Sequence, residues 1–292
     1  MNTLEITFDN LAEDSLLNFV GGKPRYSTIT SVVFLASNIL ACCHFNGKCM
    51  FLVNFDIKDQ SFKIMQKLDT TFNNEKCETD LMAYDNKGRI ITSNFYKNTC
   101  SLYNYNANTI SFVRDLNYNA GSSVHGVKFI NNDIVAVTSR TKNTGIHFFD
   151  INTCSRTNLY STPEPAIQDL CLISGDLFAM ISCFGTASFS KKSIHDSKVS
   201  LIKYNLKENS FYRINEIDFK SSHLDNIVHY KGVLYITDQF NNKIIRLNSS
   251  NLQNLGDLTD LSFPHGVDVK YDLIAITNYG LNNIILKEIS NL

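Results

Sequence analysis

Short apolar runs alternate with tight polar turns along almost the whole chain. Six segments share one plan: an apolar run, a polar turn, a stronger apolar run that ends in small polar residues, and in most cases a third strand. Turns such as Asp-Asn-Lys-Gly at 85–88 and Tyr-Lys-Gly at 230–232 are typical of β-hairpins. Helical periodicity is weak throughout, so the pattern predicts an all-β protein.

The six segments recur as a repeat. One apolar residue in the first strand of each segment marks the period: Val33, Leu81, Val127, Leu170, Ile227 and Val267. Successive markers are separated by roughly 40 to 57 residues, which is typical of a β-propeller blade with several strands. The sequence therefore predicts a six-bladed β-propeller that forms a single domain over residues 1–292.

The sixth repeat lacks a fourth strand after residues 282–292. Near the other end, Leu4, Ile6 and Phe8 alternate with polar neighbours, which is typical of a strand with one buried face. We expect this N-terminal strand to complete the last blade, because closing the ring removes open sheet edges.

Composition narrows the functional classes. The chain has 43% hydrophobic and 19% charged residues and a formal net charge of -1, which is typical of a folded protein and does not indicate nucleic acid as a partner. No apolar run is long enough to cross a bilayer, so no membrane association is expected. The eight cysteines form no C-x-x-C pair and lie mostly in apolar runs, which favours free buried thiols and a cytoplasmic location.

Two late segments carry a family resemblance. The sequences GVLYITDQFNNKIIRLN at 232–248 and FPHGVDVKYDLIAITNYGLNNII at 263–285 resemble NHL repeats. They are also similar to related six-bladed propellers, which include gluconolactonases, strictosidine-synthase-like proteins and peptidyl-amidoglycolate lyases. The resemblance implies the same fold and a functional site at the mouth of the central channel.

The residue two positions before each marker is polar, although its neighbours are largely apolar. These residues are Ser31, Thr79, His125, Gln168, Asp225 and His265. In the resembling families this position often supplies metal ligands, so the resemblance implies a similar site here. His125 and His265 belong to blades three and six, so we expect them to face one channel from opposite walls. With Asp225 they form a plausible set of ligands for a divalent metal, zinc or calcium, which Gln168 or water would complete.

Two other readings of the same positions remain open. The polar ring can bind trapped water or neighbouring strands, with Gly126 and Gly266 permitting close approach, or it can contact a ligand without any metal. The sequence also departs from its relatives: gluconolactonases have a glutamate where Thr30 or Ser31 stands, and amidoglycolate lyases use three channel histidines.

Further candidate residues lie in loops expected on the same face. Arg140 could anchor a carboxylate or phosphate, and Asp238 and Asn278 are further binding candidates. An insertion at 184–200, which contains Lys191, is expected to form either a lid or a tolerated surface loop.

The sequence thus predicts a small-molecule hydrolase or lyase with His125, His265 and Arg140 as catalytic residues. The binding candidates are Ser31, Thr79, Gln168, Asp238, Asn278 and Lys191. The alternative is a non-catalytic propeller that binds a ligand or a protein partner. No G-x-S-x-G, P-loop, dinucleotide-binding or H-E-x-x-H motif indicates a different chemistry.

Overall fold

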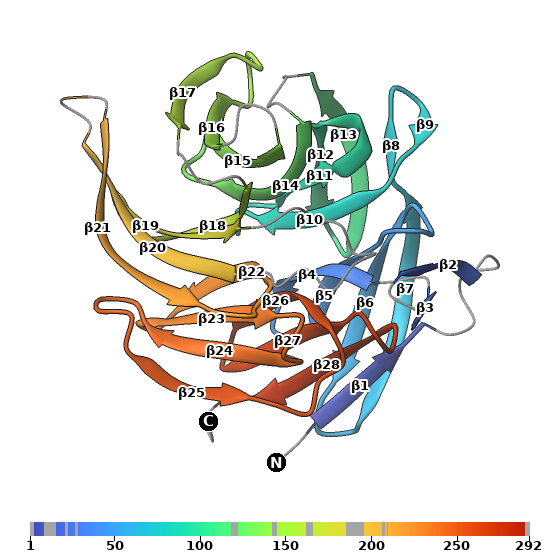
Figure 1. The fold of residues 1–292 in the computed structure, drawn as a ribbon. Coiled ribbons are helices and arrows are strands. Elements are labelled where there is room, and N and C mark those ends of the chain that lie inside the picture. The colour runs from blue at the N-terminus through green and yellow to red at the C-terminus, as the bar shows by residue number, and fades with distance from the viewer. Residues whose placement is uncertain are drawn as a thin grey trace.

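Six antiparallel sheets stand around a central axis in the computed structural model, so that the predicted all-β, six-bladed β-propeller is confirmed (Figure 1). The structure describes residues 3–8, 16–20, 23–26, 29–117, 122–141, 145–161, 166–184, 196–205, 208 and 210–289. The first strand of each blade contacts the first strands of both neighbouring blades, which makes these six strands the wall of the channel.

The first three blades follow one another along the chain. Blade 1 contains β4 (Ile29–Ala36), β5 (Ile39–His44), β6 (Cys49–Asp56) and β7 (Ser61–Asp69). Blade 2 contains β10 (Thr79–Tyr84), β11 (Arg89–Asn94), β12 (Thr99–Asn106) and β13 (Thr109–Leu116). Blade 3 contains β14 (Ser122–Phe129), β15 (Ile134–Thr141), β16 (Gly145–Asp150) and β17 (Arg156–Ser161).

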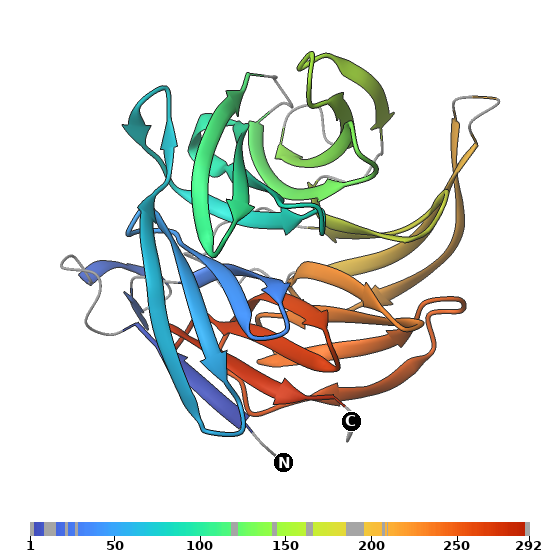
Figure 2. The same cartoon turned by 180° about the vertical axis from the view of Figure 1, so that it is seen from behind.

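The other three blades complete the ring, which Figure 2 shows from behind. Blade 4 contains β18 (Ala166–Ser174), β19 (Leu177–Phe184), β20 (Asp196–Asn205) and β21 (Ser210–Phe219). Blade 5 contains β22 (Leu224–Tyr230), β23 (Val233–Asp238), β24 (Lys243–Asn248) and β25 (Asn254–Leu258). Blade 6 contains β26 (Pro264–Lys270), β27 (Leu273–Asn278), β28 (Asn283–Glu288) and β1 (Thr3–Thr7).

Three short elements lie between the blades or within them. They are the hairpins β2 (Leu16–Val20) with β3 (Lys23–Tyr26) and β8 (Thr71–Phe72) with β9 (Glu75–Lys76), and the 3₁₀ turn η1 (Phe95–Lys97). Among the described residues, no helix is long and apolar enough to cross a membrane.

Strand β1 closes the ring as predicted. It pairs antiparallel with β28, with Leu4 opposite Leu286 and Ile6 opposite Ile284, and the two strands lie side by side in Figure 1. Leu4, Ile6 and Phe8 are buried while the residues between them are exposed. They pack in one cluster with residues of blades 1 and 6, so this strand seals the junction between the first and last blades by burying apolar surface.

The hairpin turns between first and second strands use backbone conformations that the sequence indicated. Lys231 and Gly232 have φ angles of 47° and 82°, and Tyr271 and Asp272 have φ angles of 55° and 58°. Such positive φ angles match the twist of the flanking strands, which keeps each hairpin in register.

The structure corrects the bounds of the expected insertion and leaves the expected location of the protein untested. The segment expected as an insertion to Ser200 is shorter, because Asp196 already begins β20; residues 185–195, with Lys191, lie outside the described residues. All eight cysteines are free and seven are buried, and the cytoplasmic location inferred from them stays a prediction.

Candidate metal centre

Each channel-lining strand contains a β-bulge near its start. The pairing register shifts between Val124 and Val127 in β14 and between Pro264 and Val267 in β26, and similar shifts occur in the other four blades. A bulge turns side chains away from regular alternation and is common beside functional sites. Here the bulges carry the polar residues that face the channel.

Hydrogen bonds define the equivalent position in each blade. In blades 3, 5 and 6 a threonine of the second strand accepts the N–H of the residue after the channel position, which is Gly126, Asn226 or Gly266. In blade 2 the hydroxyl of Ser93 accepts the N–H of Leu81 in the same way. The channel residue of blade 2 is therefore Asp80, one position after the predicted Thr79.

Blade 1 differs from the prediction by one residue in the opposite direction. The hydroxyl of Ser31 accepts the N–H of Met82 in the next blade, as the side chains of Asp169 and Asn226 accept backbone N–H groups of the blades that they face. Ser31 thus lies one position beyond the channel residue, which is Thr30. The physical reason is that both faces of these strands are buried, so that the apolar pattern does not fix the register.

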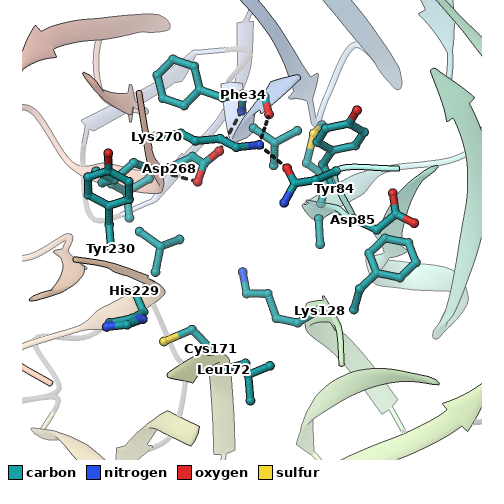
Figure 3. Close-up of a pocket in the computed structure, with 18 of the residues that line it drawn as sticks. Phe34, Tyr84, Asp85, Lys128, Cys171, Leu172, His229, Tyr230, Asp268 and Lys270 are labelled. Carbon is teal, nitrogen blue, oxygen red and sulfur yellow. Dashed lines mark hydrogen bonds between the residues drawn. The ribbon is translucent and has the colours of Figure 1, made fainter. Parts of the chain in front are cut away.

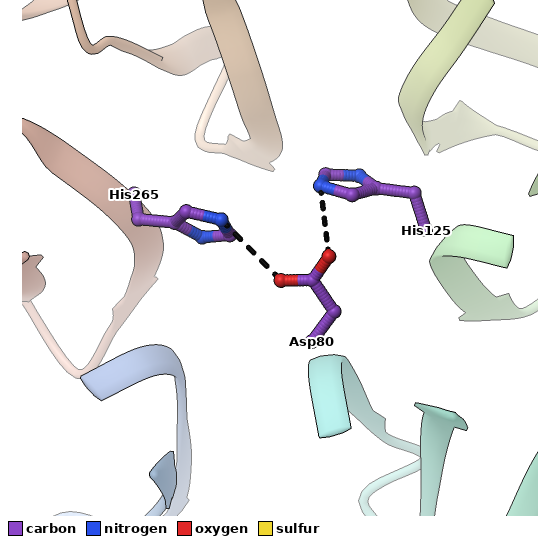
Figure 4. A group of neighbouring side chains, drawn as sticks. All are labelled: Asp80, His125 and His265. Atoms are coloured by element: carbon purple, nitrogen blue, oxygen red, sulfur yellow. Dashed lines mark ion pairs between the residues drawn. The ribbon is translucent and has the colours of Figure 1, made fainter. Parts of the chain in front are cut away.

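Four side chains from four blades meet in the channel, and we call them the His–Asp centre: Asp80, His125, Asp225 and His265. Nε2 of His125 lies 3.3 Å from Oδ2 of Asp80 and 3.5 Å from Oδ1 of Asp225. Nε2 of His265 lies 3.3 Å from Oδ1 of Asp80 and 3.1 Å from Oδ2 of Asp225. All four residues are buried, with His265 the most exposed at 8%. Figure 4 shows Asp80 between the two imidazole rings.

Backbone carbonyl groups orient both imidazole rings. Nδ1 of His125 donates to the carbonyl oxygen of Gln168 (2.7 Å), and Nδ1 of His265 donates to that of Thr30 (2.9 Å). A carbonyl oxygen can only accept, so Nδ1 carries the hydrogen in both rings and Nε2 of a neutral ring presents a lone pair. Metal-binding histidines usually donate their other ring N–H to a carbonyl or carboxylate in this way, which fixes the orientation of the ring.

The glycine after each histidine makes this support possible. A Cβ atom on Gly266 would lie 2.5 Å from the carbonyl oxygen of Thr30, which is the acceptor of His265. A Cβ atom on Gly126 would lie 2.8 Å from Cα of Asp169, the residue after Gln168. The repeated His-Gly pair therefore combines a channel ligand with the space that lets the next blade approach its ring.

The centre as it stands leaves acceptor atoms facing one another. Burial lowers the pKa of His125, although the carboxylates of Asp225 and Asp80 oppose this effect, so the ring is neutral at neutral pH. Nε2 of His125 has no hydrogen-bond partner in the described part of the chain. A lone pair that faces two carboxylates in a buried site is unfavourable unless a cation lies between them.

Asp225 has a further partner. Burial alone would raise the pKa of its carboxyl, but His265, His125 and His223 together hold it well below its ordinary range. Burial alone would lower the pKa of His223, but Cys183 and Asp225 raise it to about 9. His223 is thus an imidazolium beside Asp225, at 3.5 Å, whereas the ion-pair contacts of Asp80 within the described residues are those with His125 and His265.

The distances between nitrogen and oxygen atoms in the centre are close to those between the ligand atoms of a zinc ion. Ligand atoms about 2.0–2.1 Å from a tetrahedral zinc ion lie about 3.3 Å from one another. The four nitrogen–oxygen distances in the centre run from 3.1 to 3.5 Å, and each carboxylate faces one imidazole through Oδ1 and the other through Oδ2, so a small rotation would bring one oxygen of each carboxylate toward a shared ion. The ligand atoms of Asp80, His125 and His265 all lie within 4.8 Å of one another. Two imidazoles also favour zinc over calcium, which prefers a shell of oxygen atoms.

The remaining candidates take other positions. Arg140 packs on Phe95, with its guanidinium carbon 5.8 Å from the ring centroid, and its charge lowers the pKa of His125. The side chain of Asp238 accepts hydrogen bonds from Ser222 and Asn241, and that of Asn278 accepts the N–H of Ser262. Asp238 and Asn278 thus hold loops on this face.

The sequence analysis did not predict Asp80, which belongs to the centre, or His223, which contacts it. Asp80 could have been found by aligning Ser93 with the threonines of the other second strands, since these hydroxyls bind equivalent N–H groups. His223 lies between strands, and nothing in its local sequence indicates its contact with Asp225.

Comparison with known proteins does not assign the chain to a family. No protein-family model matches the chain, and no curated protein is similar to it at a significant level.

Proposed function

We propose that the His–Asp centre binds a divalent metal ion, preferably zinc, and that the protein is a hydrolase or lyase acting on a small carbonyl compound. One observation carries the proposal: two imidazole Nε2 atoms, each with its hydrogen on the other nitrogen, converge with Asp80 in a buried channel. A zinc ion bound there would polarise a carbonyl group or lower the pKa of a water molecule.

The chain's own residues would then have distinct roles. His125, His265 and Asp80 would hold the ion, and Asp225 would be a fourth ligand whose charge His223 partly balances. Arg140 would anchor an anionic group of the substrate at the rim, because its guanidinium lies near the centre and packs on Phe95. The resemblance to gluconolactonases and amidoglycolate lyases supports this class of reaction but does not name a substrate.

The direct test is the metal content of protein purified without chelators or nickel affinity resin. Wild-type protein should contain close to one zinc per chain, and a His125→Ala/His265→Ala double variant should contain none. His229→Ala is the matched control, since this histidine lies at the far end of β22. Zinc retained by the double variant, or absent from wild-type protein even after incubation with zinc, contradicts the metal site.

Activity is tested separately with a panel of lactones and esters. Turnover should be removed by a chelator, restored by zinc, and absent from the double variant. A metal-loaded protein that turns over nothing in this panel, and instead captures a stable partner through the rim, would support the non-catalytic alternative.

A further inference from the structure

A second cavity lies at the opposite ends of the channel-lining strands. It has a volume of about 550 Å³ and is lined by residues of all six blades, including Phe34, Tyr84, Lys128, Tyr230 and Lys270. Lys128 lies three residues beyond His125 along β14, on the other side of the bulge, and none of the four residues of the His–Asp centre is among those that line this cavity. The cavity is thus distinct from the His–Asp centre, and we call it the lysine cavity.

Two ammonium groups enter this cavity from opposite blades. Figure 3 shows Lys128 pointing into the space from β14 and Lys270 reaching across its rim from β26. Nζ of Lys270 donates to the side-chain oxygen of Asn86 and to the carbonyl oxygen of Phe34 (3.5 Å), and it lies 5.3 Å from the ring centroid of Tyr84. Lys128 is largely buried, with 15% of its side chain exposed.

The acidic groups nearby are already committed to the protein. Oδ2 of Asp169 accepts hydrogen bonds from Asn226 (2.6 Å) and from the N–H of Ile227 (3.1 Å), and lies 3.2 Å from Nζ of Lys128. Oδ2 of Asp268 accepts the N–H of Phe34 (2.7 Å). Both carboxylates therefore have few acceptor sites left for a ligand.

The capacity that remains free is therefore on the donor side. An ammonium group carries three N–H donors; Asp169 occupies one of those of Lys128, and Asn86 and the carbonyl of Phe34 occupy two of those of Lys270. Burial lowers the pKa of Lys270, although Asp268 opposes this effect, so that an additional anion would stabilise its charged form. The wall around these donors is mixed: Cys171, Leu172 and Tyr230 line one part of it, and polar residues such as Asp85 and His229 line another (Figure 3).

We propose that the lysine cavity binds a small organic anion, whose carboxylate or phosphate group lies between the ammonium groups of Lys128 and Lys270. The volume fits a metabolite-sized ligand, since pockets for such molecules range from about 300 to 1,000 Å³. The two charged donors would fix the anionic group, and the mixed polar and apolar wall would contact the rest of the molecule. This site is independent of the metal proposed at the other end of the channel.

The test uses citrate and inorganic phosphate as probes, titrated calorimetrically into the full chain at low ionic strength. Wild-type protein should bind at least one probe with one-to-one stoichiometry, and Lys128→Gln and Lys270→Gln should each weaken binding by about tenfold or more. Lys231→Gln is the matched control, because this exposed lysine pairs with Asp272 on a neighbouring turn and should change nothing. Citrate binding alone indicates a carboxylate ligand, and phosphate binding alone indicates a phosphate ester.

Several outcomes would overturn the proposal. They are no binding of either probe up to about 10 mM, equal affinity in wild-type and both lysine variants, or loss of binding in the His125→Ala/His265→Ala variant. The last result would mean that the anion binds a metal and not the lysines. Lys128→Arg keeps the charge and should keep binding, so it separates loss of the anion site from loss of the fold.

Discussion

The two ends of the channel hold buried charge in different ways. In the lysine cavity, each carboxylate has backbone or amide donors and a lysine nearby, as Asp169 has Lys128 at 3.2 Å. In the His–Asp centre, Asp80 faces the Nε2 atoms of two imidazole rings. The hydrogen of each ring is on Nδ1, where it is donated to a backbone carbonyl group. The carboxylates of the lysine cavity are therefore balanced by donors of the protein itself.

This difference separates charges that stabilise the fold from charges that require a ligand. Removing one partner of a buried ion pair leaves the other charge uncompensated and is strongly destabilising. A cluster of acceptors is unfavourable until a cation enters, so it reduces the stability of the empty protein. Asp-to-Asn substitutions at the two ends should therefore have opposite signs.

The largest effect is expected for Asp169→Asn. This change leaves Lys128 as a buried charge without its partner and should reduce the free energy of unfolding by about 3 kcal/mol. Urea denaturation measures the change. Asp272→Asn, which removes the partner of the exposed Lys231, should cost less than about 0.5 kcal/mol. Equal effects of the two substitutions would show that the Lys128 pair is not stabilising.

A somewhat smaller effect is expected for Gly266→Ala. The new methyl group would push away the carbonyl of Thr30, which orients His265, and should cost about 2 kcal/mol of stability. It should also weaken zinc binding, measured by competition with a chromogenic chelator. Gly175→Asn is the control, because open space surrounds this residue and asparagine tolerates its positive φ. Unchanged zinc affinity in Gly266→Ala would contradict the role assigned to the carbonyl.

The thiol of Cys171, which lines the lysine cavity, should make the free energy of unfolding depend on pH. Burial raises the pKa of Cys171 from 9.0 to about 12, so the unfolded chain loses this proton first as pH rises. The stability contribution is complete below pH 9 and is lost between pH 9 and 12, by about 1.4 kcal/mol per pH unit. Urea denaturation at pH 8 and 10 should show a smaller decrease for Cys171→Ala than for wild-type protein. Identical decreases would mean that Cys171 ionises in the folded state.

The smallest effect has the opposite sign. In metal-free protein, Asp80→Asn replaces a carboxylate by an amide that can donate to the imidazole nitrogens, and should raise the free energy of unfolding by about 1 kcal/mol. The same variant should bind zinc more weakly. Thermal melts with and without zinc measure both changes. If metal-free Asp80→Asn is instead destabilised, the imidazoles carry protons and Asp80 pairs with them without a metal.

The repeat made the fold predictable, since hairpins with polar turns recur often enough to count the blades and assign the closing strand. The recurrence of His-Gly also placed His125 and His265 on facing walls. Asp80 was missed because Leu81 and Met82 are both apolar in a strand buried on both faces, so a bulge decides which residue enters the channel. The sequence did not predict the lysine cavity either, because Lys128 and Lys270 line one cavity only when blades 3 and 6 face each other.

The pairing of β1 with β28 also has a consequence for the order of folding. Leu4 can meet Leu286 only after the chain between them has been arranged, and such distant contacts carry a high entropic cost and form slowly. His265 belongs to the blade that this pairing completes, whereas His125 and Asp80 lie in blades built from continuous chain. A ring that lacks its sixth blade would therefore contain Asp80, His125 and Asp225 but not His265, and zinc uptake would report the completion of the last blade.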